Sequence, residues 1–131
     1  MSPTLPSLGL VALGGALGSA ARFALSGWVL HHTVSWRFPL GTFVVNLAGC
    51  LAIGLLAGAG ERYGLFSAET RLLLMTGLLG GFTTFSAFGL ETLHLLRRGE
   101  WLVAGSYVGL SVLLGLALVW IGFGAVAARS G

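Results

Sequence analysis

The sequence has little charge and no lysine at all. Of its 131 residues, 8% are charged and 56% are hydrophobic, and the mean hydropathy is +0.94. A soluble domain of this size carries about 25% charged residues, so the composition excludes an ordinary soluble fold. The basic excess is entirely arginine, mostly near the ends of apolar stretches. Anchoring at a membrane interface therefore explains the net charge of +3 better than nucleic-acid binding does.

Residues that could support enzymatic chemistry are also scarce. The single Cys50 lies inside an apolar stretch, so no disulfide framework or cysteine metal cluster is available. No serine, histidine and acid form a hydrolase motif, and no two acids pair as general acid and base. His31, His32 and His94 lack the spacing of metal ligands. The sequence therefore predicts that the protein is not an enzyme.

What the chain does contain is four long apolar stretches, each reaching the roughly 20 residues that cross a bilayer. We place them at 8–30, 39–59, 72–96 and 101–126, with short links that leave no soluble segment. Trp28, Trp36 and Trp101 lie at their ends, where amphipathic rings prefer to sit. The prediction is an all-α, multi-pass membrane protein with four transmembrane helices that form a single domain over residues 1–131.

The centre of the third stretch is unusual for a helix in lipid. Residues 76–86 read TGLLGGFTTFS, and adjacent glycines followed by adjacent threonines form a concentrated weak point because both are poor helix formers. Non-helical backbone survives at membrane depth only where protein or a water-filled cavity satisfies it. We therefore expect a mid-span break that faces the protein interior, a natural place for an ion or solute site.

The arginines give no preference for one orientation in the membrane. They divide equally between the two sides, with Arg62, Arg71 and Arg129 on the side of the termini and Arg37, Arg97 and Arg98 on the other. The positive-inside rule then has no difference to act on. Either another cue sets the orientation, or the protein inserts both ways, which we favour. Two opposed copies could form an antiparallel, dual-topology homodimer with a closed two-fold interface.

Glycine predicts close helix packing. Among the 22 glycines, each apolar stretch has one pair at four-residue spacing, which lets helix backbones approach closely. The pairs are Gly14 with Gly18, Gly54 with Gly58, Gly77 with Gly81, and Gly105 with Gly109.

Few polar side chains lie inside the stretches. Thr42 and Asn46 are four residues apart and share a helix face, and Tyr107 and Ser111 repeat that spacing. The Asn46 amide could donate to an anion or bond to a neighbouring helix. Tyr107 alone would suit an interfacial belt, whereas Ser111 is deeper in the stretch. Both interpretations of each pair stay open on spacing alone.

The predicted break is surrounded by hydroxyls and aromatic rings. Thr83, Thr84 and Ser86 supply the hydroxyls, and Phe85 and Phe88 share a helix face. Such an aromatic pair more often serves packing. The alternative is that the electropositive edges of the rings meet a small anion without a full charge that would trap it.

Arg22 and Glu91 are the charged residues furthest inside the stretches, where charges are costly and usually functional. Arg22 could line a polar vestibule or extend towards the headgroups, and Glu91 could be solvated or pair with Arg22. The remaining donors are hydroxyls and one amide. This set suits passive movement of an anion, because conduction needs favourable but weak binding.

At these residues the chain resembles the Fluc, or CrcB-type, fluoride channels, and the resemblance covers nearly all 131 residues. Its most specific part is GGFTTFS at 80–86. Further support comes from GGALG at 14–18 with Arg22, from Gly41 and Thr42 with Asn46 and Gly49, and from Tyr107 with Ser111.

The resemblance implies a dual-topology homodimer in the cytoplasmic membrane, with two antiparallel pores that export fluoride and limit its toxicity. It implies a pore lined by Asn46, Phe85, Ser86, Phe88, Tyr107, Ser111 and Thr42, with Arg22 at the vestibule and Glu91 near the pore. It also implies a structural sodium ion at the dimer centre, held by the backbone carbonyls of Gly80 and Thr83.

One residue departs from the family pattern, and two other functions compete. The family commonly has a hydroxyl where this chain has Ala87, so conduction could be slower, or a neighbouring hydroxyl or water could compensate. A small dual-topology multidrug exporter would need an acid central to the first stretch, where Arg22 stands. A non-transporting scaffold would use the glycines only for assembly.

Overall fold

The structure is a computed structural model that describes residues 3–64 and 66–127. It contains four helical spans of membrane length: α1 (Leu5–His32), α2 (Leu40–Tyr63), a third span over Ala68–Arg97, and α6 (Trp101–Ala127). The predicted all-α class with four membrane-length helices is confirmed. Arg129, which entered the arginine count, lies outside the described residues.

The third span is interrupted, as predicted. It consists of α3 (Ala68–Arg71), a π-helical segment η1 (Leu72–Leu79), α4 (Gly80–Phe82) and α5 (Phe85–Arg97). Thr83 has φ −87° and ψ 159°, and Thr84 has φ −150° and ψ 123°. The chain is therefore extended at the two threonines, while Gly80 and Gly81 stay helical. The π-helical segment before them was not predicted.

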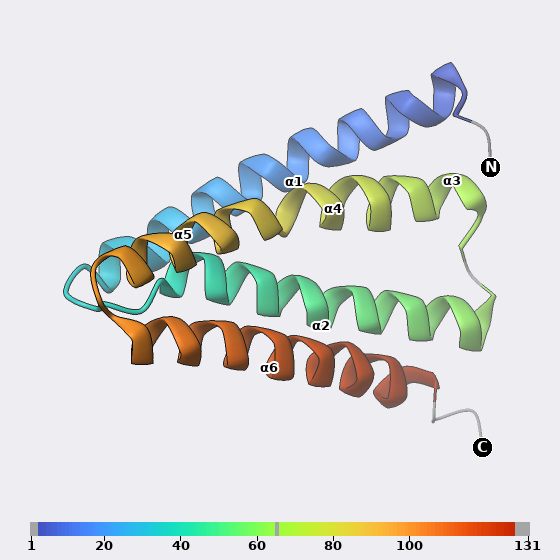
Figure 1. Ribbon diagram of the computed structural model, residues 1–131. Helices are drawn as coiled ribbons and strands as arrows, with labels where there is room; N and C mark the ends of the chain where they lie inside the picture. Colours follow the sequence, from blue (N-terminus) through green and yellow to red (C-terminus); the bar gives the residue numbers. More distant parts are fainter. Residues whose placement is uncertain (1–2, 65, 128–131) are drawn as a thin grey trace.

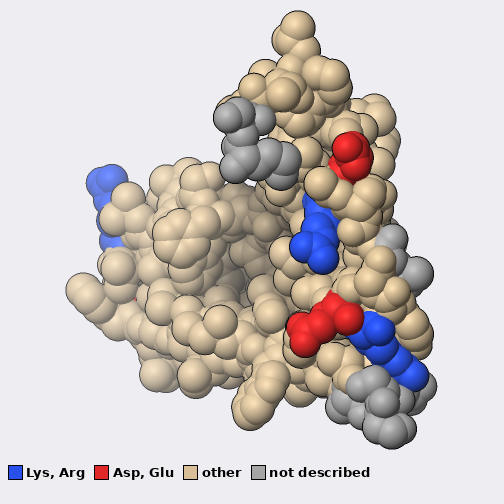
Figure 2. All heavy atoms as spheres, turned by 90° about the vertical axis from the view of Figure 1, so that its right-hand side faces the viewer, with Lys and Arg blue, Asp and Glu red and all other residues tan. Residues whose placement is uncertain are grey.

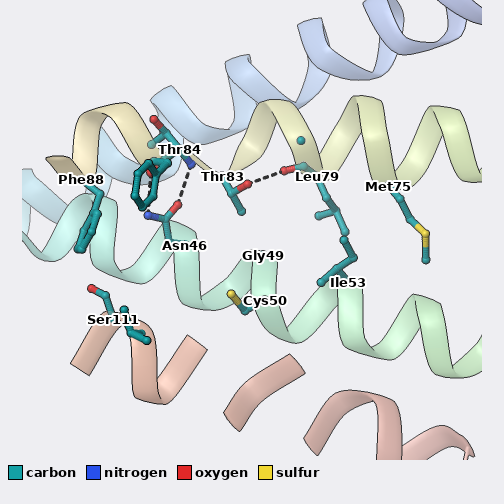
Figure 3. Close-up of a pocket in the computed structure, with 13 residues that line it drawn as sticks. Asn46, Gly49, Cys50, Ile53, Met75, Leu79, Thr83, Thr84, Phe88 and Ser111 are labelled. Atoms are coloured by element: carbon teal, nitrogen blue, oxygen red, sulfur yellow. Dashed lines mark hydrogen bonds between the residues drawn. The ribbon is translucent and has the colours of Figure 1, made fainter. Parts of the chain in front are cut away.

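The threonines stabilise the break themselves. The Thr83 hydroxyl donates to the Leu79 carbonyl at 3.0 Å (Figure 3). The Thr84 hydroxyl accepts from the Ala87 N–H at 3.3 Å and caps the start of α5. An N-cap residue needs extended backbone and a short side-chain oxygen, and a β-branched residue favours extended backbone. Thr84 meets both requirements, which places the break after the glycines.

The spans pack as two pairs (Figure 1). α1 lies along η1 and α4, and α2 lies along α6. The two termini and the α2–α3 link lie at one end of the molecule, and the α1–α2 and α5–α6 links lie at the other. Figure 2 shows the end with the termini, where charged side chains form a few separate groups on an otherwise uncharged, hollowed surface.

Glycines form the contacts within each pair. A Cβ on Gly14 or Gly18 would collide with the backbone of η1 and α4, and one on Gly81 would come within 2.7 Å of the Gly15 carbonyl oxygen. Between α2 and α6, a Cβ on Gly58 would lie 2.7 Å from the Phe123 carbonyl oxygen. Close packing at the first three glycine pairs is therefore confirmed.

The fourth pair makes no close contact within the described chain. A Cβ on Gly105 or Gly109 would meet nothing within 4 Å in the described structure. α6 instead packs on α2 through Gly115 and Gly122, where a Cβ would lie 3.3 Å from the Cys50 sulfur and 2.8 Å from the Leu51 carbonyl oxygen, respectively. The four-residue spacing identifies glycines that could allow close packing. It does not show which face of α6 packs on α2.

Candidate ion-conduction site

Asn46 connects α2 to the break. Its Nδ2 donates to the Thr84 carbonyl at 3.0 Å, and the Thr84 N–H donates to its Oδ1 at 2.8 Å (Figure 3). In a continuous α-helix the Thr84 N–H would bond to the Gly80 carbonyl. Asn46 thus supplies partners for both backbone polar groups of Thr84, which the membrane interior requires. A side-chain amide has two N–H donors, and the bond to Thr84 uses one of those on Nδ2.

The break changes the partners of several backbone carbonyls. The Ala87 N–H donates to the Thr84 hydroxyl instead of the Thr83 carbonyl, and the Thr84 N–H donates to Asn46 instead of the Gly80 carbonyl. The carbonyls of Gly80 and Thr83 consequently lose the donors that a continuous helix would give them.

Arg22 contacts the break from the opposite side. Its Nε donates to the Gly81 carbonyl at 3.1 Å, in a half-buried position. In a continuous helix that carbonyl would accept from Phe85. The arginine therefore replaces another of the hydrogen bonds lost at the break. Glu91, which could have paired with it, has its described hydrogen bond with Tyr107 instead.

A groove of about 360 Å³ runs between α2, the third span and α6 (Figure 3). It brings together residues from three spans that are far apart in sequence. Of the predicted site residues, it is lined by Asn46, Gly80, Thr83, Phe85, Phe88 and Ser111. None of the described residues that line it is charged.

The two phenylalanines form an interacting pair at the start of α5. Their ring centroids are 5.7 Å apart with a tilt of 40°, within the range of favourable aromatic contacts. Phe88 also packs on the Tyr107 ring at 5.0 Å, whereas Phe85 is 84% exposed. Contacts within the chain thus cover part of the Phe88 side chain but little of the Phe85 side chain.

Tyr107 lies in the interior and is not an exposed belt residue. Its side chain is fully buried in a cluster with Leu95 and Ala104. Its hydroxyl donates to Glu91 Oε1 at 3.4 Å, and its ring meets the Phe38 ring nearly edge-on at 5.3 Å. The Tyr107 hydroxyl and the Glu91 carboxylate therefore lie together between α5 and α6.

Some predicted site residues lie outside the groove lining. Thr42 is buried one turn before Asn46 on α2. Ser86 is exposed, with its hydroxyl 3.5 Å from that of Thr84. Arg22, Glu91 and Tyr107 also lie outside the lining.

The groove is also lined by residues that the sequence interpretation did not name as site residues. Gly49, Cys50 and Ile53 lie on the α2 side of the groove. They follow Asn46 by three, four and seven residues, so helical spacing from Asn46 would have found this face.

Comparison with known proteins identifies the family of the chain. Residues 9–123 match the family model described as CrcB-like protein, Camphor Resistance (CrcB). The fluoride-specific ion channel FluC of Methylobacillus flagellatus is 61% identical over 114 residues, which cover 87% of this chain and 89% of the relative. The FluC of Opitutus terrae is 54% identical, with 86% of each chain covered. That of Nitratidesulfovibrio vulgaris is 48% identical, with 88% and 92% covered. The chain belongs to the CrcB family, together with these fluoride-specific ion channels.

Proposed function

We propose that the protein is a passive, fluoride-selective channel that exports fluoride across the cytoplasmic membrane. The observation that carries this function is the uncharged groove beside the broken third span, where Asn46, Phe85, Phe88 and Ser111 converge. The channel activity of the close relatives supports the same function. Hydrofluoric acid is neutral and enters a cell through lipid, then ionises in the less acidic interior. A channel lets the anion leave down its electrochemical gradient and so limits its toxicity.

The groove offers weak donors to a small anion. The edges of the Phe85 and Phe88 rings carry positive partial charge, the second Nδ2–H of Asn46 is a donor, and Ser111 adds a hydroxyl. Ser86, Thr42 and Tyr107 extend this set of polar groups along the path. No fixed cation lines the described groove, so each position would bind fluoride weakly enough for the ion to leave.

Arg22 and Glu91 would act outside the narrow part of the path. Arg22 is half-buried on the far side of the break, and Glu91 accepts from Tyr107. We assign Arg22 to the vestibule, where its charge attracts anions, and Glu91 to the neighbourhood of the pore.

We infer that the working unit is an antiparallel homodimer. The groove is open, Phe85 is 84% exposed, and Gly80 is also exposed beside it. A second copy in the opposite orientation would cover this face and close the path. The equal division of the arginines supports insertion in both orientations.

A structural sodium ion would fit at the centre of such a dimer. The carbonyls of Gly80 and Thr83 lack their usual helical donors because of the break, and carbonyl oxygens suit a hard cation. Two symmetry-related breaks would supply four such oxygens. The ion would hold the two copies together and has no part in moving fluoride.

Ala87 leaves the set of hydroxyls incomplete. Its N–H donates to the Thr84 hydroxyl, and the Thr84 and Ser86 hydroxyls lie 3.5 Å apart on the neighbouring backbone. Either these two hydroxyls compensate for the methyl group at Ala87, or conduction is slower.

Release of fluoride from liposomes, followed with a fluoride electrode, tests the proposed function. Rapid release through well-folded protein is expected, and no release or equal release of chloride would contradict it. A multidrug exporter would instead need a central acid in α1, where Arg22 stands.

A further inference from the structure

A cluster of three charged residues joins the two links at the end of the molecule opposite the termini. Arg37, on the α1–α2 link, places its Nε 3.5 Å from Glu100 Oε1. Arg98, between α5 and α6, places its Nε 3.5 Å from Glu100 Oε2. The Glu100 side chain is 20% exposed, whereas those of Arg37 and Arg98 are 79% and 63% exposed. One carboxylate therefore holds two accessible guanidinium groups.

This cluster keeps an excess of positive charge and of hydrogen-bond donors. Two arginines and one glutamate carry a net charge of +1. Each guanidinium has five N–H donors, more than one carboxylate oxygen at Nε can engage. A groove of about 600 Å³ opens beside the three residues, with Val34, Ser35 and Trp36 on its other walls. The cluster can therefore receive a small anion from solution.

The register of α6 connects the cluster to the candidate path. Glu100, Ala104, Tyr107 and Ser111 follow one another at spacings of four, three and four residues, which puts them on one helix face. The Ala104 N–H donates to the Glu100 carbonyl at 2.9 Å, so the helical turn begins at Glu100. Ser111 lines the groove beside the break. Glu100 thus stands at the outer end of the face that carries Tyr107 and Ser111.

The α1–α2 link makes the same connection from the other side. Phe38 follows Arg37 directly and packs nearly edge-on against the Tyr107 ring, with centroids 5.3 Å apart. Phe88, from the groove, packs on the same ring at 5.0 Å. A chain of ring contacts through Phe38, Tyr107 and Phe88 therefore connects the charged residues to the groove.

We propose that Arg37, Arg98 and Glu100 form an anion-collecting mouth for the conduction path. The two guanidinium groups raise the local concentration of fluoride, as a cleft lined by charges of one sign does for a substrate of the opposite sign. Glu100 holds both arginines at the mouth and cancels one of their two charges, so it limits the local concentration of fluoride. This inference rests on the proposed channel function.

The experiment measures initial fluoride efflux from liposomes of zwitterionic lipid, with the full-length protein, at low fluoride and low ionic strength. Removal of one charge near a solvated path changes the local anion concentration on the order of twofold. Glu100→Gln is therefore expected to raise efflux about twofold, and Arg37→Gln or Arg98→Gln to lower it by a similar factor. The differences should vanish at about 1 M of an impermeant salt, where the Debye length is about 3 Å.

Two controls separate charge from structure. Glu69→Gln makes the same charge change on exposed α3, outside the linings of both grooves, and should leave efflux unchanged. Arg98→Lys keeps the charge and should restore most of the efflux lost in Arg98→Gln. This comparison tests the role of charge even if Glu100→Gln does not fold.

Two results would overturn this role. One is equal efflux by the wild type and all three variants at low ionic strength. The other is an equal loss in all three that persists in high salt, which would show that the cluster only fixes the links. If the wild type itself releases no fluoride, the proposed function fails instead.

Discussion

At the scale of single residues, Asn46 holds α2 against the broken third span through two hydrogen bonds with Thr84. Its residue type and its face of α2 are evident from the spacing to Thr42, and both interpretations of its amide could be stated. Its partner could not be predicted, because the contact with Thr84 depends on how α2 crosses the break. The structure shows the two interhelical bonds, and the proposed anion binding would use the second N–H of Nδ2.

Replacement of Asn46 by alanine should loosen the break. The Thr84 N–H would lose its partner, and an unsatisfied buried donor costs about 1–3 kcal/mol. We expect much faster hydrogen exchange at the Thr84 amide, measured by NMR in detergent or nanodiscs. In Asn46→Asp the acceptor for this amide is kept, so its protection should survive while fluoride efflux falls.

Ser111→Ala is the matched control for this exchange experiment. Ser111 lines the same groove but has no hydrogen bond to the break in the described structure. Its variant should leave Thr84 exchange unchanged. Unaltered exchange in Asn46→Ala would show that Asn46 does not hold the break.

Phe85 and Phe88 give a second prediction at this scale. Phe85→Ile and Phe88→Ile keep an apolar side chain but remove the ring edge, so fluoride efflux should fall by at least tenfold in each. Phe88→Ile should also cost about 1 kcal/mol of stability, because Phe88 packs on Tyr107 and Phe85 does not. A non-transporting scaffold would tolerate both changes without loss of flux. Efflux assays and thermal unfolding of the purified variants separate these outcomes.

At the scale of elements, the break was predictable and its exact place was not. The run of glycines and threonines predicts an interruption within residues 76–86. The structure puts it at Thr83 and Thr84, after η1 and α4. Gly81 remains helical because its missing side chain lets α4 approach Gly15 of α1. Propensity alone does not separate a glycine used for packing from one that ends a helix.

A matched set of alanine substitutions tests this use of glycine. Gly81→Ala would put a Cβ within 2.7 Å of the Gly15 carbonyl oxygen, so α1 and α4 must separate, and we expect a loss of about 2 kcal/mol or more. Gly105→Ala and Gly109→Ala enter open space and should be neutral, or stabilising by up to about 1 kcal/mol, in one copy.

Thermal unfolding measures the difference in stability among these three variants. Size-exclusion chromatography measures whether each variant remains a dimer. Equal destabilisation of all three would contradict the assignment of packed and open glycines. Selective loss of the dimer in the α6 variants would place Gly105 and Gly109 in the interface between copies.

At the scale of the whole molecule, four membrane-length helices follow directly from the hydropathy. The division into two close pairs does not, because each apolar helix offers several glycine faces. The proposed assembly depends on the open groove and on the balanced arginines. Addition of an arginine to the α2–α3 link should therefore bias insertion toward one orientation and reduce fluoride export in cells.

Cysteine accessibility at tagged termini measures that bias in membrane vesicles. For the wild type, labelling from both sides is expected, since both orientations coexist. Labelling from one side only would contradict the antiparallel dimer. Co-expression of two oppositely biased variants should restore export, because together they supply both orientations.

The central claim is that the uncharged groove conducts fluoride and rejects other halides. The most direct measurement is efflux from liposomes loaded with equal fluoride and chloride, recorded with electrodes for both ions and with Phe85→Ile as the inactive control. We expect that fluoride leaves rapidly, that chloride stays, and that the control releases neither. Equal release of both ions, or none from stable wild-type protein, would contradict it.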